Sequence, residues 1–180
     1  MRIFLDTEFI EDGRTIEPLS IGMVREDDKE YYVEVASNKR LEPNEWVLKN
    51  VIPHLQSWDT WVLDPFPKYG SLSSNKGAKI REVVRQEIID FCDGEQDPEF
   101  WGYFADYDWV LLCQLFGTMM DLPNRWPKYC LDIRQEMEVQ GITKSQMISR
   151  IGEGEDEEGH NALTGARYHK KIYSTLLDLT

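Results

Sequence analysis

Three apolar runs of strand length lie within the first 35 residues, at residues 2–6, 19–24 and 31–35. The third run is rich in aromatic and β-branched side chains, and the polar stretch 25–30 before it has the size of a hairpin connection. Strands that are joined by a short turn pair antiparallel. The pattern of these runs therefore predicts a three-stranded antiparallel meander, so the domain should contain a β-sheet.

The rest of the chain alternates helical and strand patterns. Residues 78–92 and 160–179 carry apolar side chains at intervals of three and four, which is typical of amphipathic helices. Short buried strands are predicted at 99–104 and 129–133, with a further helix over 108–116 between them. The predicted order is βββαβαβα, so the expected class is α/β with a mixed sheet.

The length of 180 residues predicts a single globular domain over 1–180. No apolar run approaches the roughly 18 residues of a membrane span, and the first residues do not resemble a signal peptide. We therefore expect a cytoplasmic protein that is not bound to a membrane. Cys92, Cys113 and Cys130 are spaced too widely for paired zinc ligands, and we expect reduced thiols.

Residues 53–77 combine three prolines with four aromatic side chains, which predicts a long surface loop. Its aromatic residues could form a docking surface or simply pack against the body of the domain.

The net charge of -13 argues against passive binding of nucleic acid, because an acidic surface repels phosphates. Divalent cations on clustered carboxylates would reverse the sign of the charge locally. An acidic chain can therefore still process nucleic acid when metal ions are part of its site.

Asp6 and Glu8 stand one residue apart at the end of the first predicted strand, so both side chains point to one face. Two carboxylates this close are unfavourable unless they share a proton or bind a cation, and oxygen ligands favour Mg2+ or Mn2+. The alternative interpretation is an ordinary solvated strand end.

Two further groups could join this pair. Asp108 lies where the strand at 99–104 gives way to a helix, and it is a better ligand candidate than Asp106, which suits a helix N-cap. His160 opens the last helix beside an acidic segment, where a histidine can act as a general base.

In order and spacing these residues resemble the DEDD superfamily of 3'-5' exonucleases, in the subclass whose last motif carries a histidine. The similarity is closer still to the small adenylate-preferring exoribonucleases of the mycobacterial type, and it extends over nearly the whole chain. The segments that carry it are Asp6-Thr7-Glu8-Phe9-Ile10-Glu11-Asp12-Gly13, Ile21-Gly22, Glu30-Tyr31-Tyr32, Tyr107-Asp108, Leu112-Cys113-Gln114-Leu115 and His160-Asn161-Ala162-Leu163.

The resemblance implies a ribonuclease H-like fold, with a mixed five-stranded sheet of three antiparallel strands followed by parallel strands, flanked by helices. It implies that Asp6, Glu8 and Asp108 bind two ions of Mg2+ or Mn2+. It also implies that Glu8 takes part in catalysis and that His160 is the general base. The implied substrate is the 3' end of single-stranded RNA, and a homodimer with adenylate preference is implied in the same way. Phe9, beside the pair, is a candidate to stack on a terminal base or to pack in the core.

One position departs from the family. The last motif carries an aspartate five residues after the histidine, and Gly165 stands there in this chain. A carboxylate from Glu155 to Glu158 could substitute, metal affinity and rate could be reduced, or the chain could be catalytically inactive.

Two other functions therefore stay open. One is a catalytically weakened relative that binds RNA ends or a protein partner, and the other is an exonuclease that acts on single-stranded DNA, since no motif reports contact with the 2'-hydroxyl. An acidic metal-binding structural domain would explain the carboxylates but not the place of His160.

Overall fold

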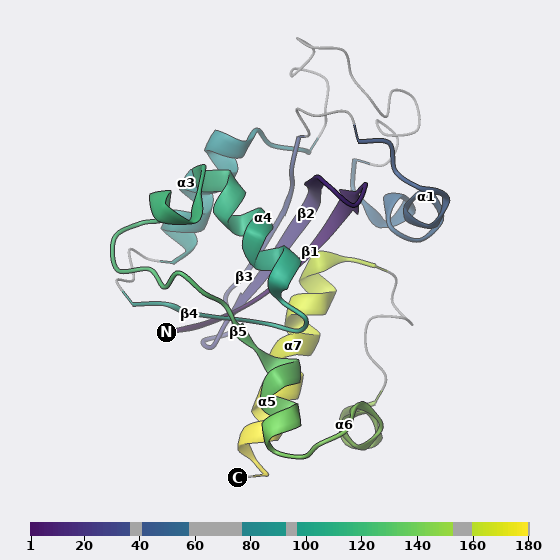
Figure 1. Cartoon of the computed structure of the whole chain (residues 1–180), viewed down its shortest axis with the longest axis vertical. Helices are drawn as coiled ribbons and strands as arrows, with labels where there is room; N and C mark the ends of the chain where they lie inside the picture. The colour runs from purple at the N-terminus through teal and green to yellow at the C-terminus, as the bar shows by residue number, and fades with distance from the viewer. Residues whose placement is uncertain (37–40, 58–76, 93–96, 153–159, 180) are drawn as a thin grey trace.

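The structure, a computed structural model, describes residues 1–36, 41–57, 77–92, 97–152 and 160–179. Within these residues lies a five-stranded sheet in the order β3-β2-β1-β4-β5 (Figure 1). The first three strands pair antiparallel, and β4 and β5 continue the sheet in parallel, which confirms the predicted α/β class and mixed sheet. The strands are β1 (Arg2–Glu11), β2 (Ile16–Arg25), β3 (Glu30–Glu34), β4 (Glu99–Gly102) and β5 (Leu131–Asp132).

Helices flank both faces of this sheet. The helices are α1 (Glu45–Asn50), η1 (Ile52–His54), α3 (Arg81–Phe91), α4 (Asp106–Phe116), η2 (Met119–Asp121), α5 (Ile133–Val139), α6 (Lys144–Ile151) and α7 (Ala162–Leu177). The sequence patterns did not predict α5 and α6, which are short. Capping side chains nevertheless mark the start of each helix. Asp132 caps α5, and Thr143 forms a capping box with Gln146 at the start of α6.

The two faces of the sheet hold separate apolar cores. Ile3 and Leu5 of β1 pack with α3 and α4, whereas Phe4 between them packs with α5, α6 and α7 (Figure 1). Alternate residues of a strand point to opposite faces, so one short run of β1 serves both cores. A third cluster, centred on Ile10 and Leu19, packs α1 and η1 against the far end of the β1–β2 hairpin.

This hairpin is longer than predicted. The predicted strands ended at Asp6 and began at Leu19, but the pairing continues to Glu11 and Ile16. The turn is held by Asp12, whose Oδ1 accepts the backbone N–H of Arg14 at 2.9 Å and of Thr15 at 2.7 Å. Gly13 follows with a φ of +79°, a left-handed conformation that glycine adopts at little cost. Asp-Gly is a common hairpin turn, and it was the local signal for this extension.

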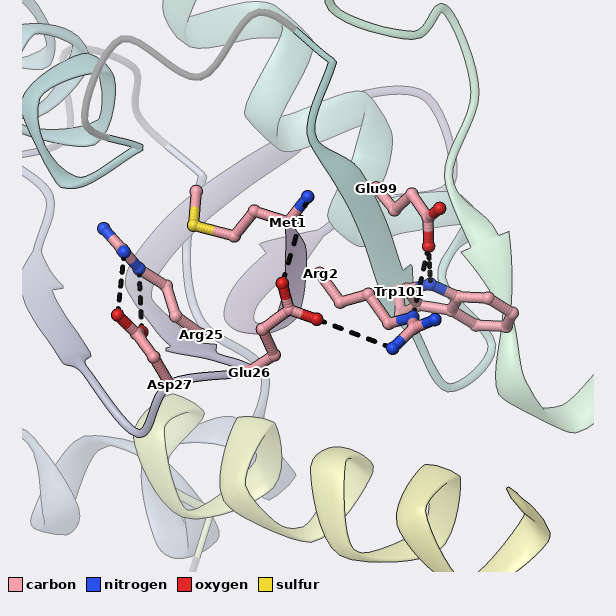
Figure 2. A network of polar contacts seen from close by, with 7 residues as sticks. All are labelled: Met1, Arg2, Arg25, Glu26, Asp27, Glu99 and Trp101. Atoms are coloured by element: carbon pink, nitrogen blue, oxygen red, sulfur yellow. Dashed lines mark hydrogen bonds and ion pairs between the residues drawn. The ribbon is translucent and has the colours of Figure 1, made fainter.

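The opposite end of the sheet is joined by the polar network in Figure 2. Glu26 lies 4.0 Å from the N-terminal amine and 3.5 Å from Arg2 Nη1. The Nε of Arg2 lies 3.4 Å from Glu99, which also accepts from the indole N–H of Trp101 at 3.5 Å. These half-exposed pairs add little stability. They tie the beginnings of β1 and β4 to the β2–β3 turn.

Cys92 and Cys113 are buried and Cys130 is partly buried, and none of these three residues is part of a disulfide bond among the described residues. Among the described residues, no helix has the length and apolar character that a membrane crossing requires.

Helix α7 lies across β1 and β2, and its first turn touches the sheet backbone. A Cβ atom built at Gly22 would lie 2.2 Å from the carbonyl carbon of Ala162, far inside any real contact distance. Farther along the helix, Arg167 donates two hydrogen bonds to Glu30, and Lys170 donates to backbone carbonyls of the β2–β3 turn. Because glycine has no side chain, the start of α7 can rest directly on β2.

We predict that Gly22→Ala pushes the first turn of α7 away from β2 and lowers the free energy of unfolding by about 3 kcal/mol. Denaturant unfolding measures the loss, and hydrogen exchange should show reduced protection of residues 162–166. Gly141→Ala is the control: its φ of +69° strains an alanine, but no heavy atom lies within 4 Å of the added Cβ. Equal protection of the first turn of α7 in both variants would contradict the role given to Gly22.

Candidate active site

Asp6 and Glu8 lie on the face of the sheet that α7 covers. In the β1–β2 register Asp6 pairs with Gly22 and Glu8 pairs with Ser20. Paired residues of neighbouring strands point to the same face, and Gly22 is the residue that meets Ala162 of α7. The register shifts immediately after Glu8, where Phe9 pairs with Pro18. A bulge at this point fits a proline, which has no N–H to donate to the ladder.

Asp108 reaches the same segment of β1 from the opposite face. The parallel pairing of β1 with β4 ends at Phe4, so the start of α4 can lie beside the next residues of β1. The hydroxyl of Thr7 donates to Oδ1 of Asp108 at 2.5 Å, and both side chains are buried. Asp108 is therefore one hydrogen bond from the residue that separates Asp6 from Glu8. Helix α4 begins at Asp106 with Ala105 as its N-cap, so the N-cap interpretation of Asp106 was wrong.

His160 lies just before Asn161, the N-cap residue of α7. The side chain of Asn161 caps the helix by accepting from the N–H groups of Leu163 and Thr164. The His160 ring meets Trp46 of α1 edge to face, with 4.7 Å between ring centroids, and Trp46 is 54 % exposed. The imidazole thus lies at a partly exposed helix start and not in an apolar core. Because Ala162 rests on Gly22, the partner of Asp6, the same contact brings this helix start to the carboxylate-bearing strand.

Sequence reasoning missed a second histidine at this site. His169 of α7 is 3 % exposed, its Nδ1 lies 2.9 Å from the carbonyl oxygen of Leu5, and its Nε2 lies 4.0 Å from Oδ1 of Asp6. Tyr103 stacks against the ring with 6.0 Å between centroids. Burial lowers the pKa of His169 to about 4, so the imidazole is neutral at pH 7. Its only signal in the sequence was its place on the apolar face of α7, where a histidine usually belongs to the core.

A buried carboxylate, Glu34, borders the site on β3 and was also missed. Ser20 of β2 pairs with both Glu34 and Glu8, which places the two carboxylates on one face of the sheet, on the two strands that flank β2. Glu34 accepts from the Tyr32 hydroxyl at 3.0 Å and from the backbone and hydroxyl of Ser57. Burial raises the pKa of Tyr32, and the charges of Glu34 and Glu8 add to the shift. Glu34 thus fixes the segment after η1 beside the carboxylate pair.

Phe9 lies on the α4 side of the hairpin, where its ring meets the edge of Tyr107 with 5.4 Å between centroids. It is partly exposed, and Tyr107 is 49 % exposed. This position is compatible with packing and with contact to a substrate, so the role of Phe9 stays a prediction.

The carboxylates suit a hard divalent cation in their chemistry, and two of them are held in place by their surroundings: Asp6 by the strand under α7 and Asp108 by the hydroxyl of Thr7. As the side chains stand, no three histidine, cysteine, aspartate or glutamate residues in the described part of the chain are grouped closely enough to hold an ion. The assignment of Asp6, Glu8 and Asp108 as metal ligands stays a prediction.

Gly165 lies in the buried part of α7, one turn before His169 on the face that packs against the sheet. Its N–H donates to the carbonyl of Asn161 at 3.0 Å, so the helix is regular there. The acidic run Glu155–Glu158, which could replace the missing carboxylate, lies outside the described residues.

The sheet order, with a carboxylate-bearing β1 at its centre and helices on both faces, defines an α/β domain of the ribonuclease H-like class. A family model described as the 3'-5' exoribonuclease Rv2179c-like domain matches residues 1–177, and the chain belongs to this family.

Two relatives from Mycobacterium tuberculosis support the assignment. They are "3'-5' exoribonuclease Rv2179c" from strain ATCC 25618 / H37Rv and "3'-5' exoribonuclease MT2234.1" from strain CDC 1551 / Oshkosh. Each is 35% identical over 169 residues, which is 93% of this chain and 88% of the relative.

We predict that Thr7 and Asp108 are energetically coupled. A buried hydrogen bond to a charged group contributes about 1.5–3 kcal/mol, so a double-mutant cycle of Thr7→Val and Asp108→Leu, each of which removes the bond, should give a coupling energy in this range. Urea unfolding measures it. Thr175→Val is the control because its hydroxyl bonds an exposed carbonyl of its own helix, and its effect should stay within about 0.5 kcal/mol. A coupling energy near zero would contradict this contact.

Proposed function

We propose that this chain is a divalent-metal-dependent 3'-5' exoribonuclease that hydrolyses phosphodiesters at the 3' ends of single-stranded RNA. Membership of the exoribonuclease family supports the reaction. The single observation that carries the site assignment is the hydrogen bond from Thr7 to Asp108, because it brings together a helix and a strand whose carboxylates are 100 residues apart in the sequence.

Asp6, Glu8 and Asp108 would hold the ions in this mechanism. When bound by these carboxylates, two divalent ions would supply Lewis-acid stabilisation of the phosphate oxygens and would lower the pKa of a water molecule. The ions would also offset the negative charge of the protein where RNA must approach.

His160 would take the proton of the attacking water. A general base must reach the water in the complex with substrate, and a partly exposed histidine beside the helix start has access that a buried one lacks. His169, which is almost fully buried, is not suited to exchange protons with solvent. We therefore assign the base to His160.

Three finer features of the substrate and assembly rest on resemblance. They are the preference for adenylate, the choice of RNA over single-stranded DNA and a homodimeric state. Phe9 of β1 is our candidate for stacking on the terminal base, since stacking accepts any base.

The direct test measures nucleotide release from 5'-labelled RNA and DNA oligonucleotides in Mg2+ and in Mn2+. The parent protein should shorten RNA from its 3' end and should be inactive after removal of divalent ions. We predict that His160→Ala lowers kcat by about 10²–10⁴-fold while metal affinity stays within about twofold of the parent value. His54→Ala, an exposed histidine of η1, is the matched control and should keep full activity. Equal loss of metal binding and turnover in His160→Ala would argue against a general base.

A second candidate function is favoured by Gly165. A site with three carboxylates facing two ions has fewer anionic ligands than the family motif supplies, so the chain could bind RNA ends or a protein partner with weak turnover. The two candidates differ in one measurement, which is the rate of nucleotide release at saturating metal.

We predict that Gly165→Asp tightens Mg2+ binding and raises turnover together, by about tenfold or more. Calorimetric titration of Mg2+ and the oligonucleotide assay measure the two effects. Gly165→Asn is the matched control, since it has the same shape without the charge and should give neither gain. A parent protein that is already fully active at ordinary Mg2+, with no gain in Gly165→Asp, would show that another group supplies the missing charge.

A further inference from the structure

Phe104 lies in the turn that joins β4 to α4, and its backbone is strained. Its φ is +56°, in the left-handed region, where a bulky side chain without polar groups is a conformational outlier. The other described non-glycine residues with a positive φ, Asp28 and Arg125, are both polar. The ring gains little burial in return, because Phe104 is 67 % exposed. The stability of the fold therefore does not explain a phenylalanine at this position.

The turn around Phe104 is held from both sides. A Cβ atom built at Gly102 would lie 2.7 Å from the Cβ of Ala105, so the chain folds back tightly between these residues. The N–H of Ala105 donates to Oδ2 of Asp132 at 2.8 Å, and its carbonyl accepts from the N–H of Trp109 in α4. Strained conformations persist where the surrounding contacts over-determine them, and they cluster at functional sites. The backbone of this turn thus keeps the ring of Phe104 at the surface.

The ring of Phe104 lies beside the candidate active site. It meets Tyr103 edge to face with 4.9 Å between centroids, and Tyr103 stacks against His169 of α7. Nε2 of His169 lies 4.0 Å from Oδ1 of Asp6. Figure 1 shows the turn between β4 and α4 beside α7. In the other direction, Asp108 follows Phe104 by four residues, in the first turn of α4. The exposed ring therefore adjoins the surroundings of both carboxylates.

A positive charge lies near the same turn. Burial raises the pKa of Tyr103, the charge of Arg134 in α5 lowers it and the charge of Asp132 raises it. Nη2 of Arg134 pairs with Glu138 at 2.7 Å, whereas Nη1 is enclosed and has no hydrogen-bond partner among the described residues. A shift of Nη1 toward a phosphate would therefore break no hydrogen bond of its own. Proteins that bind single-stranded nucleic acid combine aromatic side chains with such cations.

We infer that Phe104 is a stacking platform for a base of the RNA substrate, and that this base directly precedes the terminal one. The inference deepens the proposed function and rests on it for the presence of an RNA 3' end. Phe9, the candidate for the terminal base, meets Tyr107. Phe104 meets a different ring, Tyr103, which packs against the core beneath α5, α6 and α7. The two phenylalanines thus offer separate surfaces to two successive bases.

Photochemical cross-linking tests the contact in the parent sequence and in His160→Ala, in which turnover should be slow. The probe is a short single-stranded RNA with one 5-iodouridine, a base that cross-links to aromatic side chains on which it stacks. With the probe at the penultimate position, we predict a cross-link to Phe104 in mass spectrometry. With the probe at the 3'-terminal position, this cross-link should be absent.

Phe104→Asn separates binding from stability, because asparagine adopts a positive φ with less strain but has no ring. It should weaken RNA affinity by about fivefold or more and raise KM by a similar factor, with kcat within about twofold of the parent value. The equilibrium constant for folding should rise by about fivefold or more in urea unfolding. Phe104→Tyr should keep the RNA affinity. Met120→Asn, at an exposed position of η2, is the matched control and should also keep it.

Two results would overturn the inference. One is a penultimate base that cross-links only to other residues, and the other is folded Phe104→Asn with the affinity and KM of the parent protein. Either would leave the exoribonuclease proposal intact if RNA is degraded. Conversely, a cross-link to Phe104 in a chain that degrades no RNA would refute the proposed reaction and retain the RNA contact. A parent protein that binds no RNA would overturn both.

Discussion

The contact between Gly22 and the first turn of α7 is the constraint on which the rest of the site depends. A side chain at Gly22 would overlap the backbone of Ala162, so only glycine lets the helix lie this low on the sheet. This height lets His169 reach the Leu5 carbonyl, and it brings the first turn of α7 against β2. One absent side chain on β2 thereby sets the positions of His169 and of the start of α7.

The buried polar groups of this fold join elements that are distant in the sequence. Asp108 connects α4 to β1 through Thr7, and Glu34 connects β3 to the segment after η1 through Ser57. A buried carboxylate is costly unless it is hydrogen-bonded, so each of these groups favours one arrangement of its two elements. In this way the groups that surround the candidate site also specify its geometry.

The sequence by itself determined where the five strands lie along the chain, that Asp6 and Glu8 share a face, and that α7 is amphipathic, because the spacing of nearby residues specifies each of these. Even the longer hairpin was locally encoded by Asp12 and Gly13. Only the tertiary structure decided that His169 bonds the Leu5 carbonyl, that Asp108 bonds Thr7 and that Glu34 is buried against Ser57. These contacts join residues that are 164, 101 and 23 positions apart, and they form because sheet register and helix packing bring the partners together. No local pattern contains that information, since spacing along a chain specifies the face of an element but not the element that will cover it.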